Sequence, residues 1–230
     1  MIDAHAHPSR DDTIEIRRHD MVFAACTHEQ NWLSLQQLKK ECAQLKIGFG
    51  IHPWFTDHDR TMQDRLKTLA NLLAASPKSF LGEIGLDKSP KWRGTFDRQQ
   101  MLFEAQLQMA RHYKRPIVAH VVKAHEEAIP ALNSHPEKVY IHGFVGSPET
   151  MKRYRDAYFG ININTLRSRK TQMAIAIMPE NAILAESDNR PNLNTLNQTV
   201  SAIAKIRNWP VEKTKIICTK NARSWLGISP

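Results

Sequence analysis

The amino terminus carries two histidines separated by one residue, in the stretch Met-Ile-Asp-Ala-His-Ala-His-Pro. Alternate side chains of a β-strand point to the same face, so a strand here would group Asp3, His5 and His7. Two neighbouring imidazoles at a strand end suit a zinc, manganese, iron or nickel ion better than magnesium or calcium. A polar terminus with incidental histidines would have the same local sequence, so the ends of the other strands must decide.

Histidines and carboxylates recur where other short apolar runs end. They are His52 in Gly-Ile-His-Pro-Trp, Glu83 in Gly-Glu-Ile-Gly-Leu-Asp, His120 in Pro-Ile-Val-Ala-His, His142 in Tyr-Ile-His-Gly-Phe and Asp188 in Leu-Ala-Glu-Ser-Asp. Any one of them could be an ordinary residue: His52 could cap a turn, and His120 could be a satisfied core histidine. Buried charges without partners are costly, however. Shared coordination of a metal explains the whole set better than separate coincidences do.

These residues need a scaffold that brings strand ends together. Eight apolar or β-branched runs predict strands at residues 2–6, 22–26, 47–51, 80–84, 117–120, 139–142, 158–163 and 183–186. Helices are predicted between them at residues 32–45, 62–75, 96–113, 124–132, 148–157, 169–177 and 196–208. Eight strands alternating with helices predict a (β/α)8 TIM barrel, whose chemistry lies at the carboxyl ends of the strands. An open doubly wound sheet is the alternative.

The composition indicates one domain, spanning residues 1–230. Hydrophobic residues make up 41% of the 230, enough for a sizeable core. No apolar run approaches the roughly 20 residues that cross a bilayer, and no signal peptide pattern opens the sequence, so no membrane association is expected. The cysteines Cys26, Cys42 and Cys218 are scattered, which favours a reducing, cytoplasmic location.

The formal net charge of +9 favours a polyanionic partner such as DNA. Several basic residues follow the predicted strands, in loops on the side where the chemistry is expected. These candidate substrate contacts are Lys88, Lys123, Arg167, Arg169 and Arg190. Trp54 lies in the same set of loops and could stack on an unpaired base. An ordinary solvated surface would also explain the charges.

The motifs, taken in order, resemble those of the TatD family of metal-dependent deoxyribonucleases, which belong to the amidohydrolase-like barrels. The resemblance covers nearly the whole sequence, from the first His-x-His to Thr-Lys-Asn-Ala at residues 219–222. It departs from the family pattern at Lys88, where an aromatic residue is frequent, and at Ser187, where threonine is frequent. These departures concern the choice of substrate more than the metal ligands.

The resemblance implies one or two divalent ions in each chain, which could be magnesium, manganese or zinc. It assigns one ion to His5, His7, Glu83 and Asp188, and a second to Glu83, His120 and His142. Glu83 would bridge them, and His52 would face the substrate phosphate. Two ions about 3.5–4 Å apart can stabilise both the attacking and the leaving oxygen of a phosphodiester.

The predicted reaction is hydrolysis of a DNA phosphodiester by water that the metal activates. Asp188 would accept the proton from that water, and His142 and His52 would orient or protonate phosphate oxygens. The resemblance also implies a 3′ to 5′ exonuclease that acts on single strands or DNA ends. Hydrolysis of a C–N bond or lactone, or deamination, on a small anionic substrate is the alternative. A third hypothesis is a non-catalytic component whose metal serves assembly with unknown partners.

Overall fold

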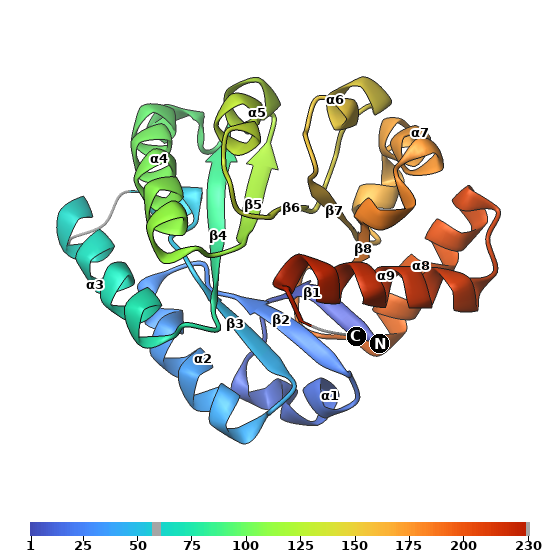
Figure 1. Cartoon of the computed structure of the whole chain (residues 1–230), viewed down its shortest axis with the longest axis horizontal. Coiled ribbons are helices and arrows are strands. Elements are labelled where there is room, and N and C mark those ends of the chain that lie inside the picture. The colour runs from blue at the N-terminus through green and yellow to red at the C-terminus, as the bar shows by residue number, and fades with distance from the viewer. Residues whose placement is uncertain (57–60, 229–230) are drawn as a thin grey trace.

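Eight parallel strands pair in the order of the sequence and form the wall of a nearly closed barrel (Figure 1). The computed structural model describes residues 1–56 and 61–228. The strands are β1 (Ile2–Ala6), β2 (Met21–Ala25), β3 (Leu45–Phe49), β4 (Phe80–Asp87), β5 (Ile117–Val122), β6 (Val139–His142), β7 (Tyr158–Ile161) and β8 (Ile183–Ala185). Because all strands run parallel, their carboxyl ends lie at one end of the barrel.

Hydrogen bonds beyond the paired strands join β8 to β1. The Asp188 amide donates to the His5 carbonyl oxygen at 3.0 Å, and the His7 amide donates to that of Asn189 at 2.8 Å. The Ser187 amide donates to Asp3 Oδ1 at 2.9 Å. The His-x-His motif at residues 5–7 and the Glu-Ser-Asp motif at residues 186–188, which are distant in the sequence, are thereby held side by side.

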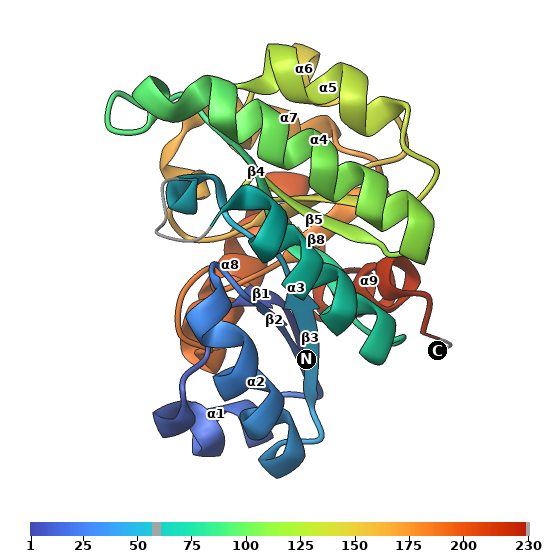
Figure 2. The same ribbon diagram turned by 90° about the vertical axis from the view of Figure 1, so that its left-hand side faces the viewer.

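Helices cover the outside of the barrel (Figures 1 and 2). They are α1 (Thr13–Arg17), α2 (Glu29–Glu41), α3 (Met62–Ala75), α4 (Phe96–Tyr113), α5 (His125–Asn133), α6 (Pro148–Lys152), α7 (Arg169–Ile177), α8 (Leu193–Arg207) and α9 (Val211–Leu226). Short 3-10 turns are η1 (Arg10–Asp12), η2 (Pro53–Phe55), η3 (Arg93–Thr95), η4 (Thr165–Arg167) and η5 (Glu180–Ala182). Residues one helical turn apart supply the packed faces, as Leu69 and Leu73 do on α3. Within the described ranges, no helix is both long and apolar enough to cross a membrane.

Helix α9 closes the amino-terminal end of the barrel, on the near side in Figure 1. Its Trp225 is fully buried. The Trp225 ring contacts those of Phe23, Phe80 and Tyr140, with centroids 5.3–5.4 Å apart. These three residues lie on β2, β4 and β6, so one side chain packs against alternate strands and leaves the opposite end of the barrel for chemistry.

The prediction of a TIM barrel is confirmed, and each predicted strand overlaps an observed one. Two helices end several residues earlier than predicted. The helix predicted to reach Leu45 ends at Glu41, and Leu45 opens β3, because its aliphatic side chain belongs to the buried strand rather than to the helix. The helix predicted over residues 148–157 ends at Lys152, since the chain turns before β7. Helices α1 and α9 were not predicted.

Candidate metal centre

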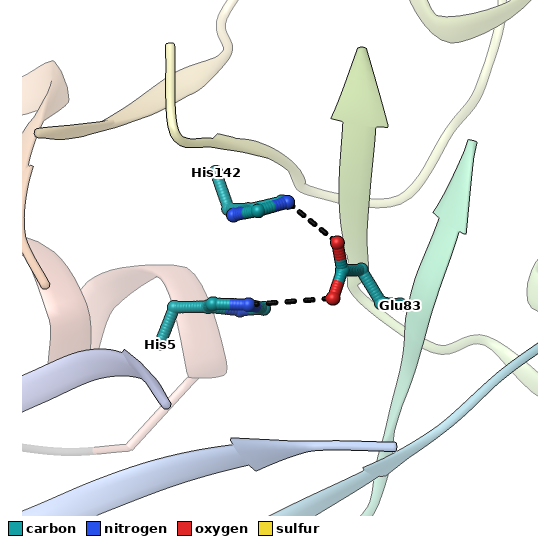
Figure 3. A group of neighbouring side chains, drawn as sticks. All are labelled: His5, Glu83 and His142. Atoms are coloured by element: carbon teal, nitrogen blue, oxygen red, sulfur yellow. Dashed lines mark ion pairs between the residues drawn. The ribbon is translucent and has the colours of Figure 1, made fainter. Parts of the chain in front are cut away.

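Glu83 is the centre of a cluster at the carboxyl ends of the strands. Strand β4 places its side chain inside the barrel, where only 1% of the residue is exposed. Its Oε2 lies 3.4 Å from the Nε2 atoms of both His5 and His7. The imidazole of His142 approaches the other carboxylate oxygen, and its ring stacks on that of His5 with centroids 4.1 Å apart (Figure 3).

The second oxygen of Glu83 faces a different set of imidazoles. Its Oε1 lies 2.6 Å from His142 Nε2, 3.1 Å from His120 Nδ1 and 3.2 Å from His52 Nε2. Strand β5 carries His120, β6 ends at His142, and His52 follows β3. The two oxygens of one carboxylate are therefore directed at two groups of nitrogen ligands.

The donor atoms fit metal ions better than they fit one another. Glu83 Oε2 is buried and accepts no hydrogen bond. The Nε2 atoms of His5 and His7 lie 3.2 Å apart, and each is 3.4 Å from that oxygen. Ligand atoms of a tetrahedral site with bonds of about 2.0–2.1 Å lie about 3.3–3.4 Å from one another. A cation at this point would coordinate all three atoms at once, including the carboxylate oxygen that has no hydrogen-bond donor.

Burial and neighbouring charge set the protonation of the cluster. Burial lowers the pKa of His5 and of His52 to about 4, so both are neutral at pH 7. Burial alone would raise the pKa of Glu83, but His142 and the other imidazoles hold it well below its usual range. Burial also opposes protonation of His142, yet Glu83 and Asp188 raise its pKa well above the usual value. A metal ion must displace that proton, because only neutral imidazole is a ligand.

Asp188 joins the cluster from the segment after β8. Its Oδ1 lies 3.4 Å from His142 Nδ1 and 3.9 Å from His5 Nε2. With 27% of its side chain exposed, Asp188 is far more open to solvent than Glu83. The residue has a φ of 53°, a left-handed conformation that aspartate and asparagine tolerate better than most residues. This turn directs the carboxylate back towards the histidines.

His52 lies against the carboxylate of Glu83 rather than at the surface. Its Nδ1 accepts a hydrogen bond from the Trp54 amide at 3.2 Å. In the neutral ring Nε2 then carries the proton and donates it to Glu83. Only 2% of His52 is exposed, and this hydrogen bond holds its ring against the Glu83 carboxylate. The expected contact of His52 with the substrate phosphate stays a prediction.

Asn162 was not predicted and connects two carboxylates of the cluster. Its Oδ1 accepts hydrogen bonds from the backbone amides of Asn164 and Thr165, at 3.0 and 3.1 Å. This fixes the orientation of the side-chain amide. Its Nδ2 therefore donates to Glu186 Oε1 at 2.8 Å and to Asp188 Oδ2 at 3.1 Å. Nothing in the sequence singled out this asparagine, because its partners come together only in the fold.

Glu186 is the buried member of this network. Its Oε1 accepts from the Gly143 amide at 2.7 Å, and its Oε2 accepts from the Tyr140 hydroxyl. A side chain at Gly160 would overlap with Glu186 and Tyr140, so the absence of a Cβ there makes room for both. Burial raises the pKa of Glu186 to about 7. Its place in the Glu-Ser-Asp motif was a signal, although only the aspartate was predicted as a ligand.

Two of the predicted substrate contacts are engaged by acidic residues. Lys88 Nζ is paired with Glu127 and lies 4.6 Å from the centroid of the Phe96 ring. Arg190 Nε donates to Asp12 Oδ1 at 2.7 Å, which ties the segment after β8 to the segment after β1. Both residues follow strand ends as expected, but their charges are partly neutralised.

The remaining predicted contacts in the loops are open to solvent, unlike the buried His52. Lys123, Arg167 and Arg169 are exposed in the segments after β5 and β7. Trp54 lies on η2, and 42% of it is exposed. These four side chains therefore lie at the surface on segments that follow strand ends.

A profile of the family described as TatD related DNase matches residues 2–227. The chain belongs to this family. It is 28% identical over 178 residues to "Uncharacterized metal-dependent hydrolase YjjV" of Escherichia coli, with 73% of this chain and 66% of that protein covered. It is 27% identical to "Deoxyribonuclease TATDN3" of Homo sapiens, with 96% and 93% covered. The crystal structure of the YjjV protein superimposes with a TM-score of 0.89 at 24% identity and covers 100% of this chain and 98% of that one.

The family and the fold were therefore predicted correctly from the sequence. The names of the relatives agree with the prediction of a metal-dependent hydrolase that acts on ester bonds. The structure brings the other five predicted ligands together near Glu83, and the assignment of all six as ligands is developed as a proposal below.

Proposed function

We propose that this TatD family member is a divalent-metal-dependent phosphodiester hydrolase that acts on DNA. The observation that carries the proposal is the position of Glu83, whose two oxygens face two separate groups of imidazoles. The proposed ligands of the first ion are His5, His7, Glu83 and Asp188, and those of the second are Glu83, His120 and His142. An imidazole-rich donor set favours zinc among the three candidate ions, whereas manganese and magnesium are better suited to the carboxylates of Glu83 and Asp188.

When bound, the ions supply an activated water and stabilise the charge on the phosphate oxygens. The chain's own residues define the rest of the chemistry. Asp188 is the proposed general base, because its carboxylate is partly exposed and held by Asn162 and His142. His52 is buried and donates through Nε2 to Glu83, so it would hold this carboxylate in place. His142 and His52 would also orient phosphate oxygens that reach them.

The expected substrate is a single strand or a frayed end of DNA, cleaved from 3′ to 5′. The net charge of +9 and the exposed Lys123, Arg167 and Arg169 support a polyanionic strand as the substrate, because several separate cations can each contact a phosphate. The three cysteines are free and buried, which fits the proposed cytoplasmic location.

A substrate panel tests the proposal. The metal-loaded protein is given end-labelled single-stranded DNA, duplex DNA and RNA, together with amide, lactone and deamination substrates. We expect cleavage of single-stranded DNA that stops on addition of a chelator. Turnover only of the carbonyl or amidine substrates would favour the alternative chemistry, and full metal occupancy without turnover of any substrate would favour a non-catalytic role.

Strand binding should depend steeply on salt, and Arg167 and Arg169 should contribute to that dependence. A plot of log affinity against log salt concentration has a negative slope. Replacing both arginines by glutamate should make this slope shallower, by about 0.7 for each phosphate of a single strand that the protein no longer neutralises. Fluorescence anisotropy of a labelled strand over a range of salt concentrations measures the slope.

The matched control is Lys40→Glu with Lys152→Glu, which changes the net charge equally on two exposed positions of α2 and α6. Its slope should stay closer to that of the parent protein. Equal slopes for the two double variants would place the strand elsewhere on the surface.

A further inference from the structure

Two tryptophans form a stack beside the metal centre. The rings of Trp54 and Trp92 are 12° from parallel, with centroids 5.4 Å apart. Lys91 Nζ lies 4.6 Å from the centroid of the Trp92 ring. Trp54 is one of the more exposed large hydrophobic residues among those described. An exposed aromatic ring can stack on a flat aromatic ligand, and an adjacent cation can bind a negative charge on the same ligand.

Buried side chains hold both tryptophans in place. Gln99 accepts from the Asp87 amide at 2.7 Å and donates to the carbonyl oxygens of Asp87 and Trp92, at 3.1 and 2.9 Å. The segment before Trp54 is fixed by Gln106, which bonds both the amide and the carbonyl oxygen of Ile51. These buried amides fix the backbone on both sides of the stack, which is therefore preorganised rather than formed by chance contact of two mobile loops.

Arg65 fixes the other end of the turn that carries Trp54. This arginine is buried, and its guanidinium donates to the Phe55 carbonyl oxygen at 2.6 Å and to Glu29 Oε2 at 3.0 Å. A buried arginine is costly unless its donors are engaged. Here the hydrogen bond from Arg65 to Phe55 fixes the short turn η2, and with it the position of the partly exposed Trp54.

Asp87 connects the stack to the metal centre. Its Oδ2 accepts from Trp54 Nε1 at 2.6 Å and lies 3.4 Å from His120 Nε2. His120 Nδ1 in turn lies 3.1 Å from Glu83. The ring centroids of Trp54 and His120 are 5.8 Å apart. The sugar of a nucleotide spans a comparable distance between its phosphate and its base.

We infer that the Trp54 and Trp92 stack binds an unpaired nucleobase of the strand whose phosphodiester lies at the Glu83 centre. The inference rests on the proposed function and specifies its substrate: the nucleotide at the reacting phosphate must be unstacked from its neighbours. Bases buried within a duplex cannot reach the tryptophans without unpairing. Recognition by stacking tolerates all four bases, because each has a π-face.

The test compares two short single strands of the same sequence. One carries a base on its terminal nucleotide, and the other has an abasic sugar at that position. Both carry phosphorothioate linkages that slow cleavage, and their affinities for the metal-loaded protein are measured by anisotropy. The parent should prefer the strand with the base by about 5- to 150-fold, the range expected for one stacked base. In Trp54→Leu the ratio should fall towards 1, and Trp54→Phe should restore part of it.

Trp209→Leu is the matched control. Trp209 also lies against cations, 4.1 Å from Arg207 and 4.9 Å from Lys213, but on the connection between α8 and α9. This variant should keep the parental ratio, and thermal unfolding of every variant checks the fold. A parental ratio near 1, or a ratio that Trp54→Leu leaves unchanged, would overturn the inference and leave the tryptophans as a packed lid. Failure of the parent to cleave an unmodified strand would instead refute the proposed function, independently of the binding ratio.

Discussion

Glu83→Ala should lose both metal ions, with affinities reduced by more than about 100-fold. Residues that merely support metal ligands contribute roughly 10- to 100-fold, and Glu83 is expected to touch both ions directly. Its Oε2 faces His5 and His7, whereas its Oε1 faces His120 and His142. Metal content after dialysis and calorimetric titration with Mn²⁺ or Zn²⁺ measure the loss, and cleavage should fall with it.

Two further variants make this result interpretable. Glu83→Gln keeps the volume of the side chain but removes the charge, so it separates the loss of a ligand from a packing defect in the barrel. Glu126→Gln changes an exposed glutamate that pairs with Arg153, and it should keep the parental metal content. Retention of one ion at full affinity in Glu83→Ala would show that the carboxylate does not bridge.

Asp188→Asn should bind metal more weakly and should slow the chemical step far more. The change preserves size and one coordinating oxygen but removes the basicity and the charge. Loss of a general base typically costs about 10²- to 10⁴-fold in rate. Single-turnover cleavage of an end-labelled strand at saturating metal measures the chemical step apart from metal loss.

The fold should tolerate this substitution. Asparagine accepts the left-handed φ of 53° at position 188, and β8 packs through residues 183–185. Asp156→Asn is a matched control, since Asp156 is exposed and also has a left-handed φ, of 50°. A near-parental rate for Asp188→Asn at saturating metal would leave Asp188 as a ligand without a role in proton transfer.

Much of the centre could be predicted because the barrel imposes a simple rule. Parallel strands that close into a barrel bring their carboxyl ends together, so His5, His120 and His142 meet although they are distant in the sequence. The type of each residue then indicated a metal. The barrel architecture does not determine the conformations of its loops, so the side chains that contact the substrate were harder to predict.

Charge pairing across loops is what the sequence did not reveal. Lys88 forms an ion pair with Glu127 of α5, and Arg190 forms one with Asp12 of η1. These partners are brought together by tertiary structure, and no spacing in the chain indicates which charges will meet. A basic residue after a strand end is therefore only a candidate until its neighbours are known.

Helix α9 could not be predicted from the spacing of apolar residues alone. Its buried face includes Thr214 and Asn221 beside Ile217, Ala222 and Trp225. The polar members are satisfied locally: Thr214 donates to the Pro210 carbonyl oxygen, and Asn221 donates to that of Ile183. A packed face that contains polar residues weakens the pattern that predicts an amphipathic helix.

Metal titration of the chelated protein tests two-metal hydrolysis most directly. The apoprotein receives Mn²⁺ in steps, and single-turnover cleavage of an end-labelled single strand is measured at each step beside the amount of bound metal. Hydrolysis at the Glu83 centre predicts no cleavage without metal and a rate that rises until two ions are bound in each chain. Cleavage that persists in excess chelator, or full occupancy of both sites without cleavage, would contradict it.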